Sequence, residues 1–103
     1  MGRALTVARV RVAAAREAEY LAVLSELESL GRVRGRHLWV FRSAREPGLF
    51  LEFSESGAME EHRAVVPATG REAALEARLH ELSERDPSSS ELWHELPLPA
   101  HAT

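Results

Sequence analysis

One short stretch, residues 37–53, contains a histidine, a glutamate and several aromatic side chains. It reads HLWVFRSAREPGLFLEF and has the alternation of two strands joined near Pro47-Gly48. Pairing around this turn predicts one face that carries His37, Trp39, Phe41, Phe50 and Glu52. His37 and Glu52 would then occupy diagonal sites about Trp39, close enough to share a hydrogen bond or a ligand.

Glu52 or His37 could act as a general base towards an acidic phenol or enol. A buried glutamate needs a partner or a raised pKa, and Arg9 and Arg11 on a neighbouring strand are the expected partners. In an active site these arginines would also stabilise an oxyanion. The alternative is a structural Arg-Glu pair with His37 at a wet rim, because structural ion-pair networks look the same in sequence.

Trp39, Phe41 and Phe50 suit two roles that the sequence leaves open. They could form an aromatic wall for a planar ligand, or they could pack against a second subunit. His80 and His94 have no histidine or carboxylate at a metal-ligand spacing, so no metal site is predicted. The sequence also lacks a glycine-rich phosphate loop and a nucleophile elbow.

The composition is that of one globular domain, residues 1–103, with an ordered core over about residues 4–98. Of the 103 residues, 45% are hydrophobic and 28% charged, and the net charge of -3 argues against a nucleic-acid-binding surface. The chain contains no cysteine, which excludes disulfides and thiolate catalysis. No apolar run is long enough to cross a membrane, so a soluble cytoplasmic protein is expected.

Hydrophobic periodicity predicts the elements. They are a strand over residues 4–13, an amphipathic helix over 16–31 capped by Gly31, the hairpin, a helix from residue 54 that breaks at Pro67 and resumes near Arg71, and a strand over 91–98. This βαββαβ order is typical of an α+β, ferredoxin-like fold, with a four-stranded antiparallel sheet and two helices on one face. Right-handed crossovers place the first and third strands at the centre.

Two helices cover one side of such a sheet and leave the other bare. The helix side is assigned Val10, Val12, Leu38, Val40, Leu51 and Phe53. The open side receives Leu5, Val7, Arg9, Arg11, His37, Trp39, Phe41, Phe50, Glu52 and Ser54. Since a soluble monomer rarely exposes so large an apolar patch, the open side predicts a two-fold homodimer.

The chain resembles the dimeric α/β barrel superfamily, and within it the antibiotic-biosynthesis-monooxygenase-like branch. The resemblance lies in the element order over residues 4–96, in FLEFSESGAMEEHR (50–63) and in the break at VVPATG. Phe53, Glu55, Ala58 and His62 occupy its aromatic, acidic, small and histidine positions. The hairpin is also similar to a barrel-like domain at the C-terminus of some bacterial major-facilitator transporters.

The resemblance implies a homodimer whose sheets enclose a pocket for a small aromatic or polyketide-like compound. It also implies cofactor-free oxygenation or isomerisation. Trp39, Phe41, Phe50, Arg9, Arg11 and His62 would bind the substrate, and His37 or Glu52 would move a proton. The alternative function is a non-catalytic dimerisation or sensor module, in which the same polar residues only fix the register of the two sheets.

Overall fold

The computed structural model describes residues 3–33, 35–56, 70–86 and 91–99. Its elements are β1 (Ala4–Arg11), the 3-10 turn η1 (Ala14–Arg16), α1 (Glu17–Arg32), β2 (His37–Arg42), β3 (Leu49–Ser56), α3 (Gly70–Leu82), β4 (Glu84–Arg85) and β5 (Glu91–His94). The α+β, ferredoxin-like order is confirmed. From residue 57 to residue 69, the region of the expected short helix and its break lies outside the described residues.

All strands of the sheet pair antiparallel, in the order β2-β3-β1-β4, with β5 also paired to β1. The first and third strands are therefore central, as predicted. The prediction of a single last strand over residues 91–98 is wrong. Two short strands take its place: β4 pairs with one end of β1 at Val10, and β5 pairs with the other end at Leu5. Residues 95–99 continue beyond β5 outside any strand, and Pro97 and Pro99 fit that position since proline cannot donate to a ladder.

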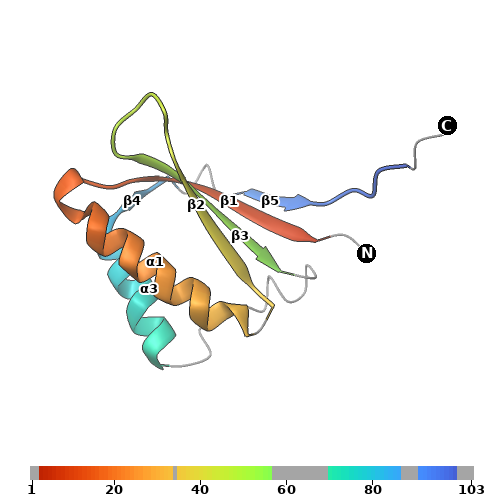
Figure 1. The fold of residues 1–103 in the computed structure, drawn as a ribbon, viewed down its shortest axis with the longest axis horizontal. Coiled ribbons are helices and arrows are strands. Elements are labelled where there is room, and N and C mark those ends of the chain that lie inside the picture. The colour runs from red at the N-terminus through yellow and green to blue at the C-terminus, as the bar shows by residue number, and fades with distance from the viewer. Residues whose placement is uncertain (1–2, 34, 57–69, 87–90, 100–103) are drawn as a thin grey trace.

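The two helices lie side by side on one face of the sheet (Figure 1). The core between the two layers contains Val10, Val12, Tyr20, Val23, Leu24, Leu27, Phe50, Leu75, Leu79 and Leu82. Bidentate ion pairs between Arg78 and Glu19 and between Arg71 and Glu26 join the exposed sides of the helices. The apolar stripes read from the sequence are thus the buried faces of the helices.

Gly31 is not the cap of α1, which is a correction to the sequence prediction. The helix continues through Gly31, and the left-handed residue is Gly35, with φ of +76°. The N–H groups of Gly35 and Arg36 donate to the carbonyls of Arg32 and Gly31 at 3.0 and 3.1 Å. These two bonds make the Schellman motif, which needs glycine at the left-handed position.

The register of the hairpin also differs from the prediction. Trp39 pairs with Phe53 and Arg42 with Phe50, so the turn spans residues 43–48. The shift by one residue moves every side chain of β3 to the opposite face. Phe50, Glu52 and Ser54 therefore lie on the helix side, and Leu51 and Phe53 lie on the open side, the reverse of the expected assignment.

Candidate ligand-binding site

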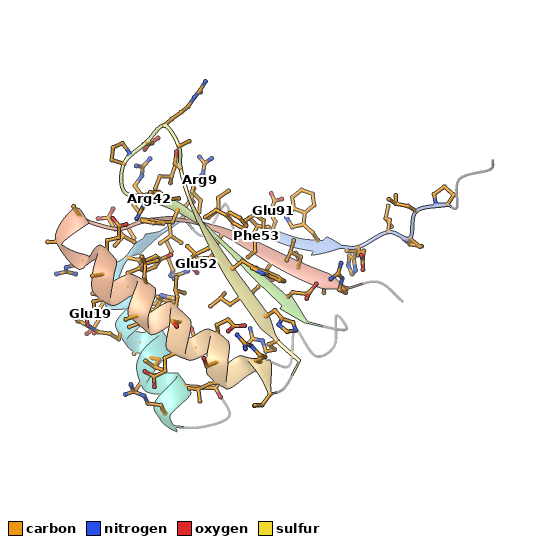
Figure 2. All side chains as sticks on the ribbon, in the orientation of Figure 1. Arg9, Glu19, Arg42, Glu52, Phe53 and Glu91 are labelled. Carbon is orange, nitrogen blue, oxygen red and sulfur yellow. The ribbon has the colours of Figure 1, made fainter. Side chains whose placement is uncertain are left out.

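Glu52 lies in a closed polar network between the sheet and the helices. Its carboxylate accepts a hydrogen bond from the Tyr20 hydroxyl at 2.6 Å and two from the Arg85 guanidinium at 2.8 and 2.7 Å. Both Glu52 and Tyr20 are buried. Figure 2 shows Glu52 in the space between the sheet and α1. The two carboxylate oxygens thus bond to Tyr20 of α1 and Arg85 of β4. The network therefore joins α1 and β4 to β3.

The network suits a structural role better than proton transfer. Burial, together with the negative charge of Glu52, raises the pKa of Tyr20 well above its ordinary value. Tyr20 is therefore a neutral hydrogen-bond donor at physiological pH. A carboxylate that accepts three short hydrogen bonds has little capacity left to take a substrate proton.

A second buried polar group lies near the opposite end of the helix-covered layer. The side chain of Glu72 on α3 is buried, and the Arg36 guanidinium donates to the Ser54 hydroxyl at 3.2 Å. Together with His37 these residues border a void of about 30 Å³. This is space for one water molecule, not for an organic ligand.

The open face of the sheet is lined by aromatic side chains. Trp39, Phe41 and Trp93 are 44, 57 and 53% exposed. Phe41 meets Phe53 edge to face, with ring centroids 5.3 Å apart, and the His37 ring stacks on Trp39 at 6.1 Å. The surface has the aromatic composition that is enriched where proteins associate.

A groove beside Trp39 is the described cavity whose size and composition best suit a small organic ligand. It has a volume of about 380 Å³ and lies between α1 and the edge strand β2. Its walls are formed by Leu21, Leu24, Ser25, Glu28, Arg32, Leu38, Trp39 and Val40. Mostly apolar walls with a few polar groups at the rim are typical of ligand sites of this volume.

The rim of the groove carries a charged pair. Arg32 donates through Nε and Nη2 to the Glu28 carboxylate, one turn earlier on α1. The hydrogen bonds from Arg32 hold the pKa of Glu28 below its usual range, and the charge of His37 acts in the same direction. Glu28 is thus a carboxylate at neutral pH, and Arg32 still has further N–H groups with which to contact an anionic substituent.

A larger groove of about 600 Å³ lies at the end of the molecule near the hairpin turn. Its charged residues are Arg11, Arg16, Glu81 and Glu84, and no aromatic side chain lines it. Arg11 is paired with Glu46, and Arg16 donates to the Glu81 carbonyl at 2.7 Å. Volume alone favours this groove, but a planar aromatic compound would find no stacking surface in it.

The structure separates the two residues predicted to act together. His37 lies on the open face and Glu52 on the helix-covered face, so the expected diagonal pair is wrong. The expected partners of Glu52 are also wrong, because Arg9 and Arg11 face the open side and Arg85 takes their place.

The expected substrate-binding residues are likewise divided between the faces. Phe50 is a core residue that packs against Tyr20, with ring centroids 5.3 Å apart, whereas Trp39 and Phe41 remain on the open face. His62 lies outside the described residues. Within the described parts of the chain, no three metal-ligating side chains gather, and no helix is long and apolar enough to cross a membrane.

Sequence reasoning did not find Tyr20 and Arg85 as partners of Glu52. One signal was present, since Tyr20 falls on the buried stripe of a helix and a buried tyrosine hydroxyl needs a hydrogen-bond partner. Glu52 is 32 residues away in sequence, and Arg85 is 33 residues beyond Glu52.

The fold is shared with solved structures of low sequence identity. A Bacteroides thetaiotaomicron protein described as a possible oxidoreductase is 18% identical, with a TM-score of 0.73, over 91% of this chain and 98% of that one. SnoaB, a cofactor-independent oxygenase from Streptomyces nogalater, is 16% identical with a TM-score of 0.67, over 97% of each chain. A proposed antibiotic biosynthesis monooxygenase from Nitrosomonas europaea is 13% identical with a TM-score of 0.73, over 93% of each.

These structural similarities define the class of this protein by its fold. The chain has the ferredoxin-like α+β fold found in proteins of the antibiotic-biosynthesis-monooxygenase type, and the resemblance seen in the sequence is confirmed at that level. No protein-family profile matches the sequence, and no curated protein matches it significantly. Because a fold hosts many activities, function must be argued from the groove and the two faces of the sheet.

Proposed function

We propose that the protein is a homodimer that binds a small aromatic compound in the groove between α1 and β2. The groove of about 380 Å³ beside Trp39 carries this proposal. Its leucine and valine side chains suit an apolar ring, Trp39 borders the groove where it meets the open face, and Arg32 suits a phenolate or carboxylate at the rim. An aromatic or polyketide-like compound with one acidic group has this combination of features.

The open face supports the homodimer. Trp39, Phe41 and Trp93 lie on one side of the sheet together with Leu5 and Val7 of β1. Covering such a surface with a second copy removes apolar area from water at about 25 cal/mol per Å² before the costs of association. Two sheets that meet face to face form the barrel implied by the resemblance.

For a catalytic function we propose cofactor-free oxygenation or isomerisation, with His37 as the group that takes a proton from the bound phenol or enol. His37 stacks on Trp39, which lines the groove, and its side chain is only partly buried. A neutral imidazole can accept such a proton through its unprotonated ring nitrogen. SnoaB, a cofactor-independent oxygenase, has a similar fold and supports this reaction class.

Binding is tested by titrating phenols and hydroxyquinones against tryptophan fluorescence. The chain has two tryptophans, so a Trp93→Phe background leaves Trp39 as the reporter. We expect saturable quenching, weakened at least tenfold by Leu21→Asp, which places a charge in the groove at a residue that is only partly buried. Val33→Asp, at an exposed site beyond the end of α1, is the matched control. Absence of quenching by every compound, with the fold intact, would contradict the binding proposal.

The catalytic step has its own test. Once a compound that binds is found, its oxygenation or isomerisation is assayed with His37→Gln, which keeps the size of the side chain but cannot take the proton. We expect the turnover rate to fall at least tenfold while the binding affinity stays nearly unchanged. Equal turnover in the two proteins would exclude His37 as the base.

One observation favours the second candidate, a non-catalytic dimerisation or sensor module. Glu52, the carboxylate expected in an active site, has both oxygens bonded to Tyr20 and Arg85. A dimer by light scattering that binds none of the aromatic compounds would favour this candidate. A monomer of about 11.5 kDa at micromolar concentration would exclude the dimer in both.

A further inference from the structure

The groove between α1 and β2 has a line of polar side chains along one wall. Ser25, Glu28 and Arg32 follow one another on α1 at intervals of three and four residues, so they share one side of the helix. Leu38 and Val40 of β2, which runs alongside α1 (Figure 1), belong to the facing apolar wall. A ligand in the groove therefore meets hydrocarbon on one side and this polar line on the other.

Arg32 uses only one edge of its guanidinium within the described part of the chain. Its Nε and Nη2 donate to the Glu28 carboxylate, one turn earlier on α1. The second edge, formed by Nη1 and the other Nη2 hydrogen, has no partner among the described residues. The Arg32 side chain is 64% exposed and that of Glu28 20%, so the guanidinium is the more accessible member of the pair. Two parallel N–H groups on such an edge match the two oxygens of a carboxylate.

Another arginine of the chain shows that one guanidinium can hold two carboxylates here. Arg3 donates through Nε and Nη2 to the Glu95 carboxylate at 3.0 Å each, and its Nη1 lies 2.9 Å from the Glu55 carboxylate. The Nε side of Arg3 thus binds one carboxylate while its other end binds a second. By the same geometry, Arg32 can bind a ligand carboxylate while it stays bonded to Glu28.

The charge of Glu28 limits which anions the second edge accepts. The hydrogen bonds from Arg32 hold the pKa of Glu28 below its usual range, so Glu28 is an anion at neutral pH. A ligand group with two negative charges, such as a phosphate monoester, is repelled by this neighbour more strongly than a group with one. A carboxylate has a single charge on two oxygens, and therefore combines the matching shape with the smaller repulsion.

Ser25 is the polar group at the other end of the line. Its side chain is exposed at the rim of the groove, and its hydroxyl donates to no described residue. Seven residues of helix separate Ser25 from Arg32, about 10 Å along the axis, and the guanidinium turns back towards Glu28. The Ser25 hydroxyl can donate to a hydroxyl or carbonyl oxygen of a ligand whose rings fill this interval.

We infer that the groove selects an aromatic acid that carries a hydroxyl or carbonyl oxygen at the far end of its ring system. The carboxylate binds the second edge of Arg32, the rings lie against Leu38 and Val40, and the distal oxygen bonds to Ser25. This inference rests on the proposed binding of an aromatic compound in the groove. It adds the orientation of that compound and the two residues that determine specificity.

Calorimetric titration at neutral pH with three naphthalenes tests each end of the ligand. The probes are 6-hydroxy-2-naphthoic acid, 2-naphthoic acid and 2-naphthol, which share one ring system and differ in their polar ends. We expect the hydroxy acid to bind about tenfold more tightly than 2-naphthol, because it adds hydrogen bonds to a charged group. Arg32→Lys keeps the charge but lacks the second edge, so it should weaken both acids about tenfold and leave 2-naphthol within about twofold. Ser25→Ala should weaken the hydroxy acid about threefold and leave 2-naphthoic acid unchanged.

Arg71→Lys is the matched control for Arg32→Lys. Arg71 donates through the same two atoms, Nε and Nη2, to Glu26 of α1. This pair borders the space between α1 and α3 and lies outside the groove. We therefore expect the affinities for all three naphthalenes to be unchanged in Arg71→Lys.

The outcomes separate the specificity of the groove from binding in it. Equal affinities for the three probes, or equal effects of Arg32→Lys and Arg71→Lys on the acids, overturn the inferred orientation. A Ser25→Ala variant with full affinity for the hydroxy acid also overturns it. In each case binding in the groove stands if Leu21→Asp weakens all three probes. If the naphthalenes do not bind but other phenols quench Trp39, the inference fails and the proposed function stands, whereas no binding by any aromatic compound overturns both.

Discussion

The two faces of the sheet differ in which side chains they bury and which they expose. The face under the helices contains Phe50, 2% exposed, and also a glutamate, a tyrosine and an arginine that bond to one another. The open face has exposed aromatic rings, and neither α1 nor α3, the two helices of the described residues, covers it. Polar groups are enclosed where they bond to one another, and apolar groups are exposed where a second copy can cover them.

This difference changes where chemistry is expected. The sequence predicts Glu52 as a catalytic candidate, an acidic residue among aromatic ones, but its hydrogen bonds to Tyr20 and Arg85 suit a structural role. The groove beside Trp39 lies where the two faces meet at the β2 edge, with walls from α1 and from the strand. A ligand there is in contact with the rigid helix-covered layer and with the surface proposed for the dimer.

Phenylalanine substitutions give the largest contrast between the faces. Phe50→Ala should lower the free energy of unfolding by about 3–5 kcal/mol, because it leaves a cavity in the core. Phe41→Ala, on a ring that is 57% exposed, should cost the folded monomer less than about 1 kcal/mol. Urea unfolding of both variants in dilute solution measures the difference.

Protein concentration sharpens the same contrast. If the open face forms the dimer, unfolding of the wild type shifts to higher urea as concentration rises, since association stabilises the folded state. Phe41→Ala should weaken that dependence, and Phe50→Ala should keep it. A similar loss of stability in the two variants at every concentration would contradict the proposed difference between a buried helix-covered face and an open face that forms the dimer.

Removing the charge at Glu52 tests whether the enclosed network is a stabilising unit. Glu52→Gln keeps the shape but replaces a charged acceptor of Arg85, so we expect a loss of about 1.5–3 kcal/mol in the free energy of unfolding. Glu91→Gln, on the open face of the same sheet, should change it by less than about 0.5 kcal/mol. Chemical denaturation at neutral pH compares the two. Equal small effects would mean that water reaches the Glu52 carboxylate.

The sequence predicts the layers well and the register of the hairpin poorly, for one physical reason. The helices and central strands follow from periodicity, which is strong in α1 and α3. In β3, the run Leu49-Phe50-Leu51 places apolar side chains on both faces of the strand, so either register buries a hydrophobic residue. The choice depends on the length of the turn, and Ser43 lengthens it by accepting hydrogen bonds from the backbone N–H groups of Arg45 and Glu46.

The candidate site depends even more on tertiary structure. Trp39 could be selected from the sequence as an exposed aromatic residue, but the groove needs α1 beside β2, which no local pattern specifies. Arg85 lies in a charged segment, ERD, that reads as a helix end. Its role appears only when β4 pairs with β1 and carries the guanidinium to Glu52.

Alkaline unfolding isolates Tyr20, since the chain has one tyrosine, no lysine and no cysteine. Its pKa is raised in the folded state by burial and by Glu52, so above the unfolded-state value of about 10 the folded protein holds one proton more. The contribution is fully present below pH 10, and the free energy of unfolding should fall by about 1.4 kcal/mol per pH unit above it. Denaturation from pH 8 to about pH 11.5 measures this slope.

Tyr20→Phe is the matched control for that slope. It removes the titrating hydroxyl and keeps the ring that packs on Phe50, so its stability should be nearly independent of pH in the same range. Tyrosinate absorbance in the wild type should rise together with unfolding and not before it. An absorbance change near pH 10 in folded protein would show that the hydroxyl is accessible, which contradicts an enclosed network.

The smallest effect is expected for the ion pairs on the outer side of the helices. Glu19 accepts two hydrogen bonds from Arg78, which hold its pKa below the usual range, but both side chains are largely exposed. Its contribution is present at neutral pH and is lost as pH falls through the carboxylate range. Glu19→Gln should therefore lower Tm only slightly at neutral pH, and less at high salt because water and salt screen exposed charges. Thermal melts at low and high salt compare it with Glu52→Gln, whose larger effect should resist salt. If salt reduced both losses equally, the covered face would be as wet as the surface, and the contrast between enclosed and exposed charge would fail.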